Sequence, residues 1–542
     1  TECIANCVLI DDKPKVTEDG FIYSYRFNDQ NYKQKEGKSA FDAHQIKGLG
    51  TIYSIEENFP DKNIVKILVS KRRKNIEMPS LLTLGNTMPP QVHQHDQALN
   101  KFLEDYILNN GENYKSIMDM LERKEPDIKN IKSGSILIEE NKDLITQSIE
   151  IVKNLNNSYL TIQGPPGTGK TYTSAKIIIE LMKAGKKVGV TSNSHEAIKT
   201  LLIAIEQQAV DQNYEFSGMR KSKSSDKHEW KFIRNVTTGK PLNMDSYSLF
   251  AGTSWFFVDP RMNKTLDYLF IDEAGQVALG TTIANATSAD NLVLIGDQMQ
   301  LSQPMRAKHE GYARMSSLDF ILEDDDTIST DKGVFLNVTR RLNKKICNYI
   351  STSFYDSRLT SDPITETRSV NLKLDPIKDE GLFYVPIDHN GCSQRSDEEA
   401  DLVEKVFNKI VNKEYKSENI TGKISAKDIM VVAPYNAQAN NIRERLKKKF
   451  KDDVRVGTID LFQGQEAKVV LISMTTSDVE SLPRHKDFFF SRNRLNVAIS
   501  RAECVAIIIF NENLLLASAS NIKEMKLINS FCKLLEFKTN YK

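Results

Sequence analysis

One stretch constrains this chain more than any other: the apolar run Tyr159-Leu-Thr-Ile-Gln163, which leads directly into a glycine-rich loop. Glycines in such a loop let backbone N–H groups converge on an anion, a lysine adds positive charge, and a threonine hydroxyl can ligate Mg²⁺. The loop comprises Gly164, Pro165, Pro166, Gly167, Thr168, Gly169, Lys170 and Thr171. Residues 174–181 continue without a helix breaker, so a bound phosphate would lie at a helix N-terminus. The stretch therefore predicts a strand, a nucleotide phosphate site and a helix.

The length of 542 residues exceeds what one hydrophobic core supports, and about 150 residues per domain predicts three or four domains. Hydrophobic residues make up 40% of the chain, but no apolar run approaches the ~18 residues of a membrane span, so we expect no membrane insertion. The 73 basic residues are balanced by 72 acidic ones, which excludes a globally basic coat. Any contact with nucleic acid must therefore come from local patches.

The six cysteines are scattered and include no CxxC pair that would indicate zinc or a redox dithiol. They predict reduced thiols in an intracellular protein, either cytoplasmic or nuclear. The chain begins without an initiator Met, at Thr1, and leads straight into strand-like sequence. We therefore expect a fragment from which an N-terminal part is missing.

Residues 1–96 contain short β-favouring runs separated by turn signals, which predict a small β-barrel. The clearest runs are Phe21–Phe27, Gly50–Ile55 and Ile64–Val69. The basic cluster Lys71–Lys74 is either a solvated charge run or a phosphate contact. Residues 97–136 show apolar residues at helical spacing, interrupted near Asn109-Asn-Gly111, and predict a two-helix stalk.

After residue 136 strand and helix patterns alternate, which indicates parallel α/β sheets. A first domain is expected at residues 137–322. The strands expected from residue 159 onward are 159–163, 187–192, 249–253, 268–272, 291–296 and 334–338, the last of which lies beyond that bound. The polar stretch 207–245 between the second and third strands predicts an insertion subdomain. A second domain, residues 323–542, has expected strands at 429–433, 454–458, 469–473 and 505–510 and expected helices at 398–411 and 437–450. The pattern predicts two nucleotide-binding α/β domains in tandem.

Two strands of the first domain end in residues suited to ATP hydrolysis. The run 268–271 ends in Asp272-Glu273, where Asp272 could hold Mg²⁺ through water and Glu273 could deprotonate the attacking water. The next strand ends in Gly296-Asp-Gln-Met-Gln300, in which Gln300 is either a γ-phosphate sensor or part of a polar turn.

These segments, together with three in the second domain, resemble the motifs of superfamily 1 helicases. The further segments are Pro434-Tyr435-x-x-Gln438, Thr458-Ile-Asp-Leu-Phe-Gln-Gly-Gln-Glu466 and Arg494-Leu-Asn-Val-Ala-Ile-Ser-Arg-Ala502. They are similar to the 5′-to-3′ branch typified by the nonsense-mediated-decay helicase and the nuclease-helicases of DNA replication. The resemblance covers about residues 143–515. It implies two RecA-like domains around one ATP, with the barrel and the insertion in the places of accessory subdomains.

The resemblance also assigns roles to single residues. Gln147 would recognise adenine, and Glu466 would belong to the ribose or phosphate-sensing network. Arg341 and Arg501 would be arginine fingers, which stabilise transition-state charge and are worth ~10³–10⁵ in rate in related NTPases. The family usually has Tyr before the first finger, stacked on the base; here the residue is Arg340.

Small polar residues and backbone amides suit a groove that follows a nucleic-acid backbone. The resemblance places Thr191, Asn193, Ser194, Thr253, Tyr435, Thr458 and Asp460 along a single strand. Trp255 is either a base-stacking platform or part of the core. We expect a monomeric 5′-to-3′ translocase and helicase that uses ATP and Mg²⁺ and binds single-stranded nucleic acid, DNA rather than RNA. The alternative is an ATPase that remodels protein–nucleic-acid complexes without unwinding; further protein partners are open.

Overall fold

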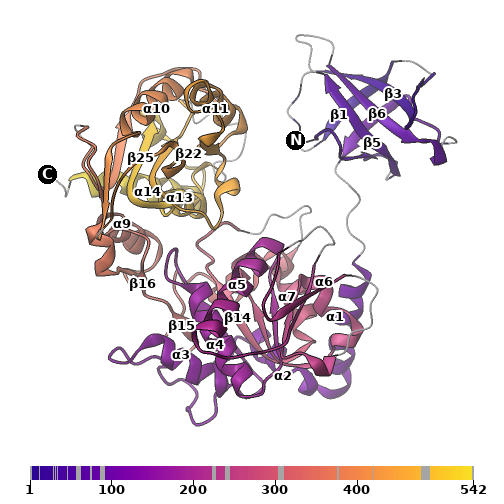
Figure 1. Ribbon diagram of the computed structural model, residues 1–542, viewed down its shortest axis with the longest axis vertical. Coiled ribbons are helices and arrows are strands. Elements are labelled where there is room, and N and C mark those ends of the chain that lie inside the picture. Colours follow the sequence, from indigo (N-terminus) through magenta and orange to yellow (C-terminus); the bar gives the residue numbers. More distant parts are fainter. Residues whose placement is uncertain are drawn as a thin grey trace. The chain divides into compact units, whose positions relative to one another are not determined.

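The computed structural model describes residues 3–539 except 11–12, 29, 31, 33, 46, 57–62, 74–75, 86–91, 223–227, 238–243, 303–309, 375–376, 419 and 478–488. The chain divides into two compact units, Thr1–His93 and Gln94–Lys542 (Figure 1). Within the described residues, no helix combines the length and the apolar character needed to cross a membrane.

The first unit is a small antiparallel β-barrel. Its strands are β1 (Ile4–Leu9), β2 (Lys15–Val16), β3 (Gly20–Phe27), β4 (Ser39–Asp42), β5 (Lys47–Glu56), β6 (Asn63–Ser70) and β7 (Leu81–Gly85). Pairing follows the order β1-β7-β4-β5-β6-β3, and β1 also pairs with β3, so six strands close the sheet while β2 extends β3. Val65, Ile67 and Val69 alternate into the core with more exposed neighbours, as expected for a barrel strand. The predicted barrel is confirmed.

The basic cluster of the barrel follows β6. Lys71, Arg72 and Arg73 form a 3₁₀ turn with no buried residue, and Lys74 lies outside the described residues. Both interpretations of the cluster, solvated charge or phosphate contact, stay predictions.

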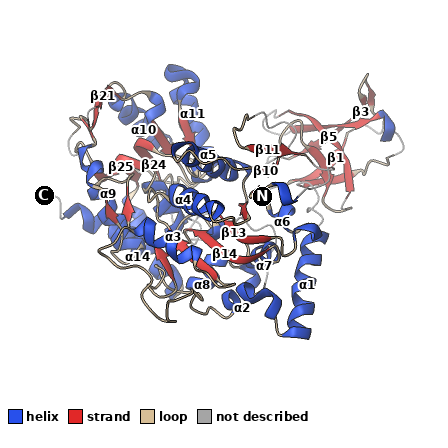
Figure 2. Cartoon of the chain, turned by 60° about the horizontal axis from the view of Figure 1, so that its bottom comes forward, coloured by secondary structure: helices blue, strands red, loops and turns tan. Residues whose placement is uncertain are grey.

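The second unit begins with a lobe, residues 94–335, built on an eight-stranded parallel sheet (Figure 2). Its strands are β8 (Tyr159–Gln163), β9 (Val188–Thr191), β10 (Gly218–Lys221), β11 (Ile233–Val236), β12 (Leu249–Ala251), β13 (Leu266–Ile271), β14 (Ala289–Gly296) and β15 (Gly333–Phe335). The order is β11-β10-β12-β9-β13-β14-β8-β15. Every described pairing in this sheet is parallel.

Helices cover both faces of this sheet, because successive strand residues point to opposite sides and both sides are apolar. The helices are α3 (Leu144–Lys153), α4 (Lys170–Lys183), α5 (His195–Asp211), α6 (Ser254–Phe257), α7 (Leu279–Ala286) and α8 (Ser317–Leu322). Leu160 and Ile162 of β8 pack in the same core cluster as α4 and α5, whereas Tyr159 packs in the cluster of α7 and α8.

The predicted stalk consists of α1 (His93–Asn109) and α2 (Lys115–Leu121), separated near Asn110 as expected. Ile117 and Met120 of α2 are fully buried in the core cluster of the first lobe, and Phe102 of α1 is nearly so. These helices are therefore packed on the first lobe instead of forming a separate element.

The expected insertion at 207–245 is wrong. Residues up to Asp211 complete α5, and β10 and β11 extend the same sheet beyond β12 as parallel strands, with β11 at the edge. The polar, lysine-rich composition misled the prediction, because the two strands are only four residues each and carry few apolar residues. The parts 223–227 and 238–243 lie outside the described residues.

The expected boundary at 322/323 is also wrong, because β15 still pairs with β8 in the first sheet. The second lobe, residues 338–539, holds a five-stranded parallel sheet of order β19-β25-β24-β22-β23. Its strands are β19 (Gly381–Pro386), β22 (Ile429–Val432), β23 (Arg455–Gly457), β24 (Ala467–Ser473) and β25 (Ala502–Phe510). Short strands flank it: β16 (Val338–Thr339), β17 (Thr360–Ser361), β18 (Ser369–Val370), β20 (Glu414–Ser417) and β21 (Ile420–Lys423).

Helices again cover both faces of the second sheet (Figure 1). They are α9 (Lys344–Phe354), α10 (Asp397–Ile410), α11 (Asn436–Phe450), α13 (Arg492–Ile499) and α14 (Ile522–Thr539). The N-cap of α10 is Ser396, whose side chain accepts a hydrogen bond from the Glu399 backbone N–H. Three acidic residues in the first turn interact favourably with the positive end of the helix dipole. The two predicted tandem α/β domains are confirmed.

Candidate active site

The glycine-rich loop lies between β8 and the N-terminus of α4, as predicted. Gly167 and Gly169 have φ of +76° and +82°, a left-handed conformation that side chains disfavour. A Cβ on Gly164 would lie 2.3 Å from Cγ of Lys170, so glycine is needed for the lysine to fold beneath the loop. Lys170 Nζ donates to the Gly164 carbonyl at 2.6 Å. The lysine is thus held inside the loop, and a bound phosphate would replace the Gly164 carbonyl as the acceptor of its hydrogen bond.

The tip of this loop touches the second lobe. Thr339 Oγ1 donates to the Pro166 carbonyl at 2.8 Å, and the Arg340 backbone N–H donates to the Gly167 carbonyl at 2.9 Å. A Cβ on Gly167 would lie 2.4 Å from Cβ of Arg341. The loop of the first lobe and the predicted first arginine finger are therefore direct neighbours.

The carboxylate pair follows β13, at the carboxyl edge of the first sheet. Asp272 is buried, and Glu273 has φ of +55°, a strained backbone that is typical of functional turns. Burial and then the charge of Glu273 raise the pKa of Asp272 to about 7, while the Lys170 ammonium acts in the opposite direction. A buried carboxylate beside an acidic neighbour and a phosphate loop is a site that favours an added cation.

The residues predicted to hold Mg²⁺ fit that ion. Mg²⁺ takes oxygen ligands, keeps several waters, and is bound in nucleotide sites through one or two carboxylates plus substrate phosphates. Thr171 offers a hydroxyl beside the loop lysine, and Asp272 offers the carboxylate whose charge is disfavoured without a cation.

Asp297, which follows β14, is a buried carboxylate that links the two lobes. It accepts from Gln300 Nε2 at 2.9 Å and from the Tyr355 hydroxyl at 2.7 Å, and Asn496 Nδ2 donates to the same hydroxyl oxygen at 2.8 Å. Burial raises the pKa of Asp297, whereas Lys170 and these donors oppose the shift. Gln300 therefore lies within a network that connects the phosphate loop to α9 and α13.

The backbone of the β14 exit loop is also held by α13. Asn493 Nδ2 donates to the carbonyls of Gln298 (2.6 Å) and Gln300, and Asn496 Nδ2 donates to the Met299 carbonyl at 2.8 Å. Three consecutive carbonyls of the first lobe are thus bound by two asparagines of the second.

The two predicted fingers and Glu466 form one cluster in the second lobe. Arg341 Nε donates to Glu466 Oε2 at 2.7 Å, and Arg501 donates to the carbonyls of Val497 (3.1 Å) and Gln465 (3.0 Å). Burial and then the charge of Arg341 lower the pKa of Arg501, while Glu273 of the first lobe opposes the shift. Arg501 thus interacts electrostatically with both Arg341 and Glu273.

Three residues bear on base recognition. The Gln147 side chain accepts from the Glu139 N–H and donates to the carbonyls of Glu139 and Lys142, so adenine would have to exchange with these bonds. Arg340 forms an ion pair with Asp362 at 3.1 Å. Tyr172, next to Thr171, is 39% exposed, and its ring lies 4.7 Å from the Lys176 ammonium. The sequence interpretation missed Tyr172, although its position beside the loop was a signal.

The predicted strand contacts lie at strand exits and helix starts of both lobes. Thr191 ends β9, Ser194 caps α5 by accepting from Glu196 N–H, and Asn193 Nδ2 donates to the Gln276 carbonyl. Thr253 precedes α6, Tyr435 precedes α11, and Thr458 precedes a 3₁₀ turn. Asp460 forms an ion pair with Arg494 at 3.1 Å. Their roles in strand binding stay predictions.

Trp255 is half-buried and packs edge-to-face on His95 of α1, with ring centroids 4.4 Å apart. The His95 Nε2 is also hydrogen-bonded to Ser254 Oγ at 2.7 Å. Trp255 thus fixes α1 to α6.

Two family models match this chain, each described as an AAA domain: one covers residues 147–305 and the other residues 318–513. The DNA polymerase alpha-associated DNA helicase A of Schizosaccharomyces pombe is 24% identical over 419 residues, which cover 65% of this chain and 61% of that protein. The DNA replication ATP-dependent helicase/nuclease of Saccharomyces cerevisiae is 26% identical over 418 residues, 70% of this chain and 26% of that protein. The regulator of nonsense transcripts 1 homolog of Drosophila melanogaster is 24% identical over 428 residues, 69% of this chain and 35% of that protein.

In sequence, the chain is similar to the superfamily 1 helicases. The predicted resemblance is confirmed, and the two AAA matches coincide with the cores of the two RecA-like lobes. The chain spans less than two thirds of the length of each of these three relatives.

The structure adds inter-lobe contacts to which the sequence interpretation assigned no residues. Asp297, Asn493 and Asn496 carry the contacts between the lobes described above. Asp297 and Asn496 lie inside segments that resemble helicase motifs, and Asn493 directly precedes one of them. Hydrogen bonds between segments almost 200 residues apart leave no local pattern in a sequence.

Proposed function

We propose that this chain is an ATP-driven motor that moves 5′ to 3′ along single-stranded nucleic acid and unwinds duplex. The observation that carries the proposal is the gathering of one phosphate loop, two carboxylates and two arginines from both lobes. Lys170 has an electrostatic contact with Asp272, and Glu273 has one with Arg501 of the other lobe. Such an arrangement can stabilise the charge of phosphoryl transfer only while the lobes are together.

The chemistry follows from the positions of these groups. Lys170 and the loop amides hold the phosphates, and Glu273 accepts a proton from the attacking water. Mg²⁺, when bound through Thr171 and Asp272, supplies positive charge at the phosphate oxygens. Arg341 and Arg501 stabilise the charge that develops on the transferred group. Arg341 must first leave Glu466, to which it is paired here.

Movement requires that the state of the nucleotide reaches the second lobe. The β14 exit loop is suited to this because Asp297 is electrostatically coupled to Lys170 and hydrogen-bonded to Tyr355 of the second lobe. Loss of the γ-phosphate would change the field at Lys170 and thereby the contacts to α9 and α13. Alternate opening and closing of the lobes on a strand then gives directed movement.

The nucleotide base would lie near α3 and the start of α4. Gln147 is the proposed adenine contact of the family type, after exchange of its present bonds. The half-exposed ring of Tyr172 is the proposed stacking partner in place of the aromatic residue that position 340 lacks. Arg340, which stands where the family usually has Tyr, is a second proposed contact to the base, by stacking of its guanidinium.

The strand would run across Thr191, Asn193, Ser194 and Thr253 of the first lobe and Tyr435, Thr458 and Asp460 of the second. These residues stand at carboxyl ends of parallel strands or at helix starts, where backbone N–H groups are available to phosphates. We favour DNA over RNA, as two of the relatives above are named for DNA replication or DNA polymerase.

The test is ATP hydrolysis with poly-dT and poly-U at the same salt concentration, followed by strand displacement on 5′- and 3′-tailed duplexes. We expect strong stimulation by a single strand, displacement only from the 5′ tail, and a loss of hydrolysis to background for Lys170→Ala. Stimulation without displacement would favour a remodelling ATPase. Hydrolysis that is indifferent to every strand would contradict the proposal.

A further inference from the structure

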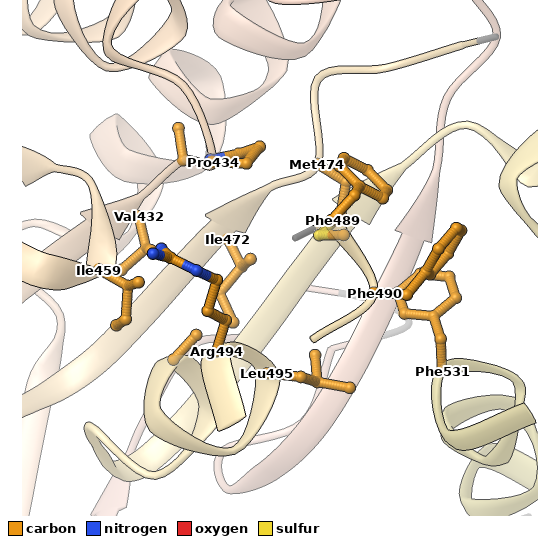
Figure 3. A pocket seen from close by; sticks show the side chains of 12 residues that line it. Val432, Pro434, Ile459, Ile472, Met474, Phe489, Phe490, Arg494, Leu495 and Phe531 are labelled. Atoms are coloured by element: carbon orange, nitrogen blue, oxygen red, sulfur yellow. The ribbon is translucent and has the colours of Figure 1, made fainter. Parts of the chain in front are cut away.

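A pocket lies at the carboxyl edge of the second sheet, and no residue of the phosphate loop lines it (Figure 3). Its empty volume, which includes space open to solvent, is about 530 Å³. Its walls come from the exits of β22 and β24 and from α13 and α14, and include Pro434, Met474, Phe490, Arg494 and Phe531. Nothing in the motif chemistry described above uses this pocket.

The position of the pocket follows from the topology of the sheet. β22 and β24 are neighbours, but β22 continues through α11 to β23 on one side and β24 continues through α13 to β25 on the other. Connections that leave neighbouring parallel strands in opposite directions open a crevice at their carboxyl ends, which is the usual ligand position of such sheets. Val432 to Pro434 and Ile472 to Met474 border this crevice.

The lining is aromatic and apolar with one cation. Phe489 and Phe490 pack edge-to-face with centroids 5.1 Å apart, and Phe490 packs on Phe531 at 5.7 Å. Arg494 extends from α13 between Ile459 and Ile472, so its guanidinium lies on the side of the pocket opposite the rings (Figure 3). Flat apolar walls with one hydrogen-bond donor group match a planar heteroaromatic ring with a polar edge.

The wall formed by Met474 is held in place by buried polar contacts. The fully buried Glu399 carboxylate accepts from Ser473 Oγ at 2.5 Å and from the Thr475 N–H at 2.8 Å, on either side of Met474. Thr475 has φ of +73°. The pocket edge is thus fixed before any ligand binds, which lowers the entropy lost on binding.

The residues next to the lining are proposed strand contacts. Tyr435 follows Pro434 in the chain, Thr458 and Asp460 flank Ile459, and Asp460 pairs with Arg494 at 3.1 Å. Each of these positions is adjacent in sequence to a residue that lines the pocket. A nucleotide whose phosphate is held there would therefore have its base beside the crevice.

We infer that this pocket accepts one unstacked base of the bound single strand. The inference rests on the proposed function. The base would lie against the phenylalanine and methionine walls. Arg494, which donates from both terminal nitrogens to Asp460 here, would exchange part of that pair for an acceptor on the edge of the base. Stacking of this kind tolerates all bases, because each has an aromatic face. The pocket would give the second lobe a grip on the strand in addition to its backbone contacts.

The test uses a thymidine oligonucleotide of the footprint length, with one abasic site moved through each position in turn. The wild-type chain should bind one of these oligonucleotides about tenfold more weakly than the unmodified one, because base–aromatic stacking is worth ~1–3 kcal/mol per base. Met474→Trp should fill the pocket. This variant should bind the unmodified oligonucleotide as weakly as the wild type binds the sensitive abasic one, and the position of the abasic site should no longer affect its binding. Met474→Leu keeps a similar volume and should behave like the wild type.

The outcomes separate the two proposals. Equal binding of all abasic oligonucleotides by the wild type, with binding itself intact, would overturn the pocket assignment and leave the motor proposal standing. Absence of any binding to single strands would contradict the motor proposal itself. A thermal melt of Met474→Trp shows whether that variant is folded, and the wild-type series decides the question without it.

Discussion

At the scale of single residues, the buried carboxylate Asp272 is the proposed Mg²⁺ contact whose charge depends on pH near neutrality. Its pKa of about 7 means that the side chain holds a proton below neutral pH, since burial and Glu273 disfavour the charged form. Because the folded value exceeds the ordinary value of 3.8, this group stabilises the fold in acid, and that contribution is lost as the pH rises to about 7.

Mg²⁺ binding should therefore strengthen as the pH rises, whereas the contribution of this group to fold stability falls. Above about pH 7 the carboxylate is already charged, whereas below it the cation must displace the proton, so affinity for Mg²⁺-nucleotide should fall up to about tenfold per pH unit. Calorimetry in buffers of different ionisation enthalpy should detect nearly one proton released at about pH 6 and almost none at about pH 8. Asp272→Asn should remove the release; an unchanged proton count in that variant would assign it elsewhere.

Tyr172 is the residue whose substitution tests base stacking. Tyr172→Ala should raise KM for ATP about five- to tenfold and change kcat less than about twofold, because the ring would stabilise bound nucleotide equally before and during reaction. Tyr172→Phe retains the ring and should keep the wild-type KM. Steady-state hydrolysis at saturating single strand measures both constants; an unaltered KM for the alanine variant would exclude the ring as a base contact.

At the scale of elements, the loop after β14 is held by two elements of the other lobe, α9 and α13. The hydroxyl of Tyr355 is central, since it donates to Asp297 and accepts from Asn496 at 2.7 and 2.8 Å. Asn493 and Asn496 bind three carbonyls of the same loop. A change on one side of this junction must be transmitted to the other, because the buried donors and acceptors have no water to replace a lost partner.

Tyr355→Phe should uncouple these elements while leaving them packed. We expect kcat for strand-stimulated hydrolysis to fall about tenfold with little change in nucleotide affinity, and stability to fall by about 1–3 kcal/mol from the unsatisfied Asp297. Stopped-flow nucleotide binding and thermal melting measure the two effects. Tyr349→Phe is the matched control, since Tyr349 is an equally buried tyrosine of α9 outside this network. Equal losses in both variants would indicate a general packing defect.

At the scale of the whole molecule, the chain combines a self-contained barrel with a two-lobed catalytic unit. The barrel closes its own sheet and has its own core cluster, which includes Cys7, Tyr25 and Ile67. A closed barrel has no free sheet edges, so its stability does not depend on a neighbouring sheet.

A fragment of residues 1–93 should therefore fold alone. We expect cooperative thermal unfolding by circular dichroism and a Cys7 thiol that does not react with a disulfide reagent at pH 8 until the fragment unfolds. Burial raises the pKa of Cys7 to about 12, so the reactive thiolate is almost absent in the folded state. Cys3 is less buried and serves as the internal control. Gradual unfolding with an exposed Cys7 would show that the barrel needs the rest of the chain.

The sequence alone determined the features that depend on local order: β8, the phosphate loop and α4, the Asp272–Glu273 turn, and the strand runs of both lobes. These follow from apolar periodicity and from backbone positions that only glycine tolerates, both of which are properties of consecutive residues. The tertiary structure decided which distant residues come into contact: the placement of β10 and β11 in the first sheet, the packed stalk, the Asp297–Tyr355–Asn496 network and the pocket at β22 and β24. Such features depend on which strands become neighbours and which groups lose contact with water, and no local pattern encodes either.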